Sequence, residues 1–168
     1  MRRAVCSGSF DPVTLGHINI FERASRLVDE LVVCVFHNVR KQGFFPVEMR
    51  VEMLREATGH IPNIRVDSSG GLLPDYMRAH GIQTIIRGLR SATDFEYECG
   101  EARVIRHLLP EAETIFLLAD PGYSFVSSSA IREIALFCGS VSGLVPECVE
   151  RAVASWQEEH PAAGGGRD

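Results

Sequence analysis

The sequence predicts an α/β fold with a five-stranded, mainly parallel sheet and helices on both faces. Short runs rich in β-branched residues alternate along the chain with segments of helical period, which is the pattern of βαβ units. The 168 residues, 45% of them hydrophobic, suit a single core. We therefore expect one domain over residues 1–159, followed by a low-complexity, disordered tail over 160–168.

Five short apolar runs are the expected strands. They cover residues 3–6, 31–36, 64–66, 84–86 and 114–118. Open α/β sheets bind ligands at the carboxyl ends of their strands. The residues that follow these runs are therefore the first candidates for a binding site.

Segments of helical period separate the strands. A first helix opens at His17, with apolar residues at Ile18, Phe21, Leu27 and Val28. Later helices are expected over 47–57, 72–80, 94–109, 128–137 and 146–158. Pro74 predicts a break in the third of these helices, and Pro110 ends the fourth.

Composition excludes several classes of protein. A net charge of -5 argues against a nucleic-acid or anionic-membrane partner, which would need a basic face. The five scattered cysteines, without a C-x-x-C pair, are typical of reduced thiols and indicate neither zinc nor disulfides. With no signal peptide and no apolar run long enough to span a membrane, the chain is expected in the cytoplasm.

The stretch from Gly8 to His17 predicts a phosphate site. The first strand runs into a glycine turn, and a helix follows. Glycine lets the backbone approach an anion, and the N–H groups and dipole of a helix N-terminus favour negative charge. The chain has no P-loop, no G-x-G-x-x-G and no G-x-S-x-G elbow. A histidine at the mouth of such a turn suits nucleotidyl transfer.

The motifs support a family resemblance. Gly8-Ser9-Phe10-Asp11-Pro12 with Thr14-x-Gly16-His17 resembles the T/H-x-G-H signature of the nucleotidyltransferase superfamily. Segments 38–41, 87–90 and 123–129 follow in the order and spacing of bacterial phosphopantetheine adenylyltransferases, so the resemblance spans about residues 3–150. Cytidylyltransferases and nicotinamide-mononucleotide adenylyltransferases usually carry histidine at the position of Thr14. Class I aminoacyl-tRNA synthetases are far longer. The resemblance implies a Rossmann-like dinucleotide-binding fold.

The resemblance also implies a reaction. The adenylyl group of ATP, with Mg²⁺, would pass to 4'-phosphopantetheine in coenzyme A biosynthesis, giving dephospho-CoA and pyrophosphate without a covalent enzyme intermediate. It further implies a homohexamer and leaves CoA open as a feedback inhibitor. Two alternatives stay open: a paralogue acting on another small phosphate or phosphonate, and a non-catalytic nucleotide- or CoA-binding protein.

Four residues match the family's catalytic positions. His17 would contact the α-phosphate as a hydrogen-bond donor, and Ser9 would orient the acceptor phosphate. Lys41 would bridge the attacking and transferred phosphates, and Arg90 would hold the nucleotide phosphates. No residue is expected to ligate a metal.

The other expected site residues divide between the two substrates. Glu98 would meet the ribose, Tyr123 would lie near the adenine, and three serines would hold the β- and γ-phosphates. The ATP side comprises Ser9, Phe10, His17, Gly88, Arg90, Glu98, Tyr123, Ser127, Ser128 and Ser129. The acceptor side comprises Ser9, Lys41, Leu72, Leu73, Arg87 and Glu133. Gly88 is expected to turn the backbone so that Arg87 and Arg90 reach one cavity.

The chain departs from the family on one helix. Gly100, Glu101 and Ile105 replace an amide, a large apolar residue and an asparagine that helps to hold the pantetheine arm. Isoleucine cannot form the hydrogen bonds of asparagine. The sequence therefore leaves open whether this helix still accepts phosphopantetheine.

Overall fold

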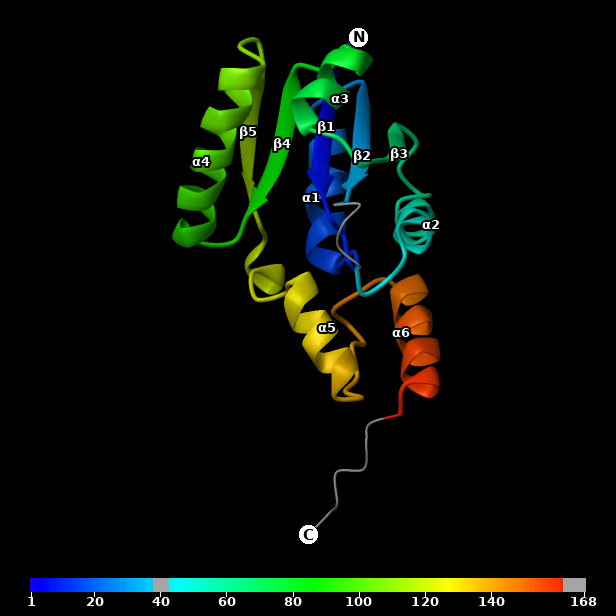
Figure 1. The fold of residues 1–168 in the computed structure, drawn as a ribbon. Coiled ribbons are helices and arrows are strands. Elements are labelled where there is room, and N and C mark those ends of the chain that lie inside the picture. The colour runs from blue at the N-terminus through cyan, green and yellow to red at the C-terminus, as the bar shows by residue number, and fades with distance from the viewer. Residues whose placement is uncertain (38–42, 162–168) are drawn as a thin grey trace.

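The sheet is fully parallel and follows the order β3-β2-β1-β4-β5. The computed structural model describes residues 1–37 and 43–161 (Figure 1). The strands are β1 (Arg3–Gly8), β2 (Glu30–Phe36), β3 (Ile64–Ser69), β4 (Thr84–Leu89) and β5 (Glu113–Leu118). The prediction of a five-stranded Rossmann-like α/β fold is confirmed.

Helices cover both faces of this sheet. The elements are α1 (Leu15–Ser25), α2 (Val47–Ala57), α3 (Leu73–His80), α4 (Ala92–Leu108), the 3-10 turn η1 (Pro121–Tyr123), α5 (Ser128–Leu136) and α6 (Glu147–Glu159). Figure 1 shows α5 and α6 beyond the carboxyl ends of the strands. These ends therefore face a second group of helices.

Strand alternation divides the buried side chains into two cores. Ala4 and Cys6 of β1 join a core with Phe21 and other residues of α1, α2, α5 and α6. Val5 joins the opposite core, with residues of α3 and α4 that include Ile105. Successive strand residues point to opposite faces, and a parallel sheet is covered on both.

Two expectations about the helices are wrong. Pro74 does not break α3, because it lies in the first helical turn, where the missing N–H has no helical acceptor to lose. The first helix begins at Leu15 rather than His17, because Thr14 is its N-cap. Leu27 and Val28 lie beyond its end.

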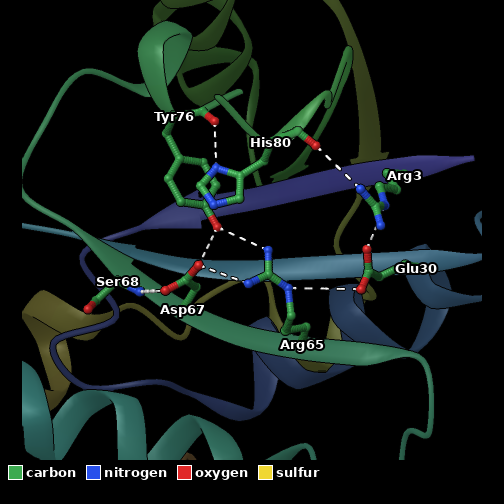
Figure 2. Close-up of polar contacts among 7 residues, drawn as sticks. All are labelled: Arg3, Glu30, Arg65, Asp67, Ser68, Tyr76 and His80. Atoms are coloured by element: carbon green, nitrogen blue, oxygen red, sulfur yellow. Dashed lines mark hydrogen bonds and ion pairs between the residues drawn. The ribbon is translucent and has the colours of Figure 1, made fainter. Parts of the chain in front are cut away.

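A polar network fastens α3 to the sheet edge (Figure 2). The Tyr76 hydroxyl donates to Asp67 Oδ2 at 2.6 Å, and Arg65 Nη1 lies 3.0 Å from the same oxygen. Glu30 continues the network, with Arg65 Nε at 3.9 Å from Oε1 and Arg3 Nε at 2.8 Å from Oε2. Burial raises the pKa of Tyr76, so its hydroxyl stays protonated and donates. The network holds α3 in place, and the first residues of α3 line part of the candidate site.

Candidate active site

A cavity of about 620 Å³ lies where β1 and β4 end, and we call it the main cavity. Its walls come from the turn after β1, from the start of α4 and from the N-terminus of α5. All ten residues expected on the ATP side line it: Ser9, Phe10, His17, Gly88, Arg90, Glu98, Tyr123, Ser127, Ser128 and Ser129. Residues from distant parts of the chain thus share one concave surface.

His17 is held by the start of its own helix. Thr14 Oγ1 accepts the His17 backbone N–H at 3.4 Å, and the Thr14 backbone N–H donates to His17 Nδ1 at 3.1 Å. This reciprocal pair is a capping box in which histidine takes the place of the usual Glu or Gln. Because Nδ1 accepts, the neutral ring carries its proton on Nε2.

The ring of His17 is neutral at pH 7. Burial lowers the pKa of His17 to about 4, and the charge of Arg90 adds to the shift. The rings of Phe10 and Phe21 pack around it, with centroids 5.2 and 6.3 Å away. The neutral ring can therefore donate a hydrogen bond at pH 7, but it has no acidic proton to transfer.

The glycine turn before His17 is tightly packed. A Cβ added at Gly8 would lie 3.0 Å from Phe10 Cζ, so any larger residue there would crowd the Phe10 ring. Phe10 itself has φ 43°, which is uncommon for a non-glycine residue. Strain of this kind concentrates at ligand-binding turns.

Helix α5 holds the same turn from outside. Ser128 Oγ donates to the Pro12 carbonyl at 2.8 Å, and Arg132 Nη1 donates to the Asp11 carbonyl at 2.6 Å. The Ser127 side chain caps α5 by accepting the Ala130 N–H at 3.1 Å. The two phosphate-binding candidates, the turn and the α5 N-terminus, are thus joined directly.

The Asp11 carboxylate anchors the chain before α2. It accepts the backbone N–H groups of Phe44 at 2.7 Å and Phe45 at 2.9 Å. The buried Arg50 donates from Nη1 to the Ser9 carbonyl at 3.0 Å, and its Nε lies 3.9 Å from Asp11 Oδ1. These contacts fix the position of the chain just after residue 42.

Arg90 enters the main cavity beside an acidic partner. Its Nε lies 3.0 Å from Asp94 Oδ2, in the first turn of α4, and Nη1 donates to the Val126 carbonyl at 3.3 Å. A further contact from Nη2 to Asp94 Oδ1 at 3.5 Å helps to orient the guanidinium, while its remaining N–H groups stay available. The arrangement suits an anion that approaches from the cavity.

Arg87 connects the cavity to β1 and α4. Nη1 donates to the Ser7 carbonyl at 2.8 Å, and Nε lies 3.3 Å from Glu98 Oε2. Burial raises the pKa of Glu98, and the charge of Arg87 opposes that shift. Arg87, expected on the acceptor side, and Glu98, expected on the ATP side, therefore contact each other.

Gly88 serves a different purpose from the one expected. It lies inside β4, paired with Leu117, rather than at a turn. A Cβ at Gly88 would approach Ile20 Cγ1 to 2.9 Å, so glycine lets α1 pack closely on the strand. Close helix packing, not a backbone turn, explains the glycine.

A smaller cavity of about 220 Å³, the side cavity, adjoins the main one. Ser7, Gly8 and Arg87 border both cavities. Leu72 and Leu73 line the side cavity, together with Glu101 and Ile105 of α4. Its walls are more strongly apolar than those of the main cavity, which also carries His17, Arg90 and the serines of the α5 N-terminus.

Comparison with known proteins identifies the family. The model of the cytidylyltransferase-like family matches residues 5–134. The chain is 49% identical over 153 residues to a protein named phosphopantetheine adenylyltransferase from Shouchella clausii (strain KSM-K16), covering 91% of this chain and 96% of the relative. The chain belongs to the phosphopantetheine adenylyltransferase family. It is therefore an enzyme of the nucleotidyltransferase class, as the signature motifs predicted.

Two residues of the family pattern are not placed in either cavity. Glu133 is exposed on α5 and lines neither the main nor the side cavity. Lys41 lies outside the described residues. Gly100, one of the three departures from the family, is exposed on α4, whereas Glu101 and Ile105 face the side cavity.

Sequence reasoning missed several residues that build this phosphopantetheine adenylyltransferase site. It gave no role to Asp94, which orients Arg90, or to Arg132 and the Asp11–Arg50 pair, which hold the turn. Asp94 and Arg90 are close in the sequence, but Arg90 lies before α4, so helical spacing does not predict their contact. The other contacts join residues far apart in the chain.

Among residues 1–37 and 43–161, no group of three or more His, Cys, Asp or Glu side chains could hold a metal ion.

Within the same residues, no helix is long and apolar enough to cross a membrane.

Proposed function

We propose that the enzyme transfers the adenylyl group of ATP to 4'-phosphopantetheine, giving dephospho-CoA and pyrophosphate. The single observation that carries this proposal is the junction of two cavities at Arg87. The larger is sized for a nucleotide and carries serines, a histidine and arginines, and the smaller is more strongly apolar. The name of the Shouchella clausii relative supports the same substrates.

The reaction needs positioning and charge neutralisation more than a protein nucleophile. An oxygen of the acceptor phosphate attacks the α-phosphorus of ATP. The bond from that phosphorus to the bridging oxygen breaks, and pyrophosphate leaves with the electron pair. Because the attacking group is already an anion, no general base is required. Oriented donors and cations stabilise the crowded transition state.

His17 supplies one such donor in this proposal. Thr14 occupies Nδ1, so Nε2–H is the group that the ring offers to the α-phosphate. A neutral donor needs no proton transfer and stays in one form throughout the pH range of the cytoplasm. Preorganisation by the capping box lowers the cost of orienting the ring.

The phosphates are divided among the remaining polar groups. Arg90 and the Ser127–Ser129 run, at the α5 N-terminus, hold the β- and γ-phosphates. Ser9 and Arg87 hold the acceptor phosphate, and Lys41 bridges it to the α-phosphate. Glu98 meets the ribose, and Tyr123 lies against the adenine.

The acceptor arm occupies the side cavity. Leu72 and Leu73 at the start of α3 and Ile105 of α4 supply an apolar wall for a chain of this kind. Glu133, exposed outside both cavities, has no place in this part of the proposal. Magnesium enters as the MgATP substrate, bound mainly by phosphate oxygens and water.

The first experiment measures pyrophosphate release from ATP and Mg²⁺, with and without 4'-phosphopantetheine, and identifies the product by mass. Formation of dephospho-CoA is expected. Turnover only with another phosphate or phosphonate would support a paralogous transferase. Nucleotide binding without pyrophosphate from any acceptor would overturn the proposed activity.

We also propose that the enzyme is a homohexamer in the cytoplasm. Large apolar side chains are exposed over several elements and suit contacts between copies: Phe95, Tyr97, Val104, Leu108, Leu118, Phe125, Leu136 and Phe137. All five cysteines are unpaired, which suits a reducing compartment.

A further inference from the structure

The Ser7 hydroxyl is buried without a hydrogen-bond partner among the described residues. Ser7 is 8% exposed, and its Oγ makes no hydrogen bond. Buried hydroxyl groups are nearly always satisfied, because leaving one unpaired costs free energy. Ser25, exposed to 7%, follows the rule and donates to the Glu22 carbonyl at 2.9 Å. Ser7 is the exception that needs an explanation.

The position of Ser7 suggests where the missing partner comes from. It is one of three residues that border both the main cavity and the side cavity. Val5, two residues earlier in β1, belongs to the core formed with α3 and α4. Strand alternation therefore directs the Ser7 side chain to the same face, where the side cavity lies.

The surroundings of Ser7 are short of polar groups. Apart from Ser7, Arg87 and Glu101 are the only described residues that bring polar side chains to the side cavity. Arg87 is already engaged with the Ser7 carbonyl and with Glu98. A ligand that passes from the main cavity into the side cavity and carries a hydroxyl or amide would find the Ser7 hydroxyl at the junction.

We infer that Ser7 Oγ hydrogen bonds the acceptor arm next to its phosphate. This inference rests on the proposed function, because 4'-phosphopantetheine carries hydroxyl and amide groups just beyond its phosphate. Serine has one side-chain torsion with three staggered positions, so its hydroxyl can turn toward the arm without backbone movement. Ser7 is thus a specificity residue on β1.

The inference predicts opposite effects on binding and on stability. Ser7→Ala removes a hydroxyl that is unpaired in the free enzyme, so the melting temperature of the free enzyme stays the same or rises. The same change raises the KM for 4'-phosphopantetheine roughly 5- to 10-fold, because a neutral hydrogen bond to the ligand is lost. The KM for ATP is unchanged.

Ser25→Ala is the matched control. It removes a partnered hydroxyl of similar burial that lines neither cavity, so the melting temperature falls while both KM values stay as in the wild type. Calorimetric titration with pantetheine, which lacks the phosphate, separates the arm from the phosphate. Ser7→Ala should weaken pantetheine binding by the same factor.

Three outcomes would overturn the inference. They are an unchanged KM for the acceptor, a joint rise of both KM values with a lower melting temperature, and a loss restricted to the phosphorylated compound. Failure of the proposed function is a different result, because the wild-type enzyme itself would then make no dephospho-CoA.

Discussion

At the scale of single residues, His17 shows how local backbone chemistry sets the state of a functional side chain. The Thr14 N–H fixes the tautomer, and burial keeps the ring neutral. Both effects come from the first turn of α1 and the rings around it. The residue is thereby prepared as a donor before any nucleotide arrives.

Replacing His17 with alanine tests this role. If Nε2–H acts mainly in the transition state, His17→Ala lowers kcat by about 100-fold or more and changes ATP affinity little. Steady-state kinetics and calorimetric titration with a non-hydrolysable ATP analogue measure the two effects. His60→Ala, on an exposed histidine paired with Glu22, should leave both unchanged. Equal losses in turnover and in ATP affinity would contradict the role.

The lowered pKa of His17 predicts a pH dependence of stability. The unfolded chain binds a proton at His17 near pH 6.5, whereas the folded protein resists until about pH 4. The free energy of unfolding therefore falls as pH drops from about 6.5 to 4, by up to about 3 kcal/mol from this group. Denaturant titrations over this range, compared with His17→Gln, measure the contribution. Identical pH profiles for the two proteins would rule it out.

At the scale of elements, the contact of α1 with β4 depends on a missing side chain. Gly88→Ala forces its Cβ against Ile20 and should destabilise the fold by about 1–3 kcal/mol. Gly100→Ala on exposed α4 meets open space and should instead stabilise by up to about 1 kcal/mol. Thermal unfolding of the two variants compares them. An unchanged stability of the Gly88→Ala variant would show instead that α1 shifts freely to make room for the added methyl group.

The sequence predicted elements better than their contacts. Short apolar, β-branched runs between segments of helical period predicted which segments form strands, because every central residue of β1 and β2 is buried and all of them except Ser7 are apolar. The same patterns wrongly predicted a turn at Gly88 and a helix break at Pro74. Glycine occurs both in turns and at close contacts inside strands, and proline occurs both at helix breaks and in first helical turns, so only the surrounding structure decides between them. The ten residues that the motif resemblance assigned to the ATP side line one cavity.

At the scale of the whole molecule, several large apolar side chains are exposed to solvent in the single chain, which is unfavourable unless another surface covers them. Phe125, Leu118 and Phe137 are 70, 71 and 79% exposed in the single chain. A hexamer would cover such side chains and raise stability with protein concentration. Light scattering coupled to size-exclusion chromatography should give about six times the 18.5 kDa of one chain. A monomer at micromolar concentration would contradict the proposed assembly.

The bonds from α5 to the turn after β1 also bear on the order in which the enzyme becomes competent. Ser128 and Arg132 reach back 116 and 121 residues to Pro12 and Asp11. A ribosome-bound chain that has exposed only the five strands has neither these braces nor the serine run. The turn after β1 therefore gains its support from α5 only once residue 132 has left the exit tunnel, so this part of the site forms among the last contacts of the newly made chain.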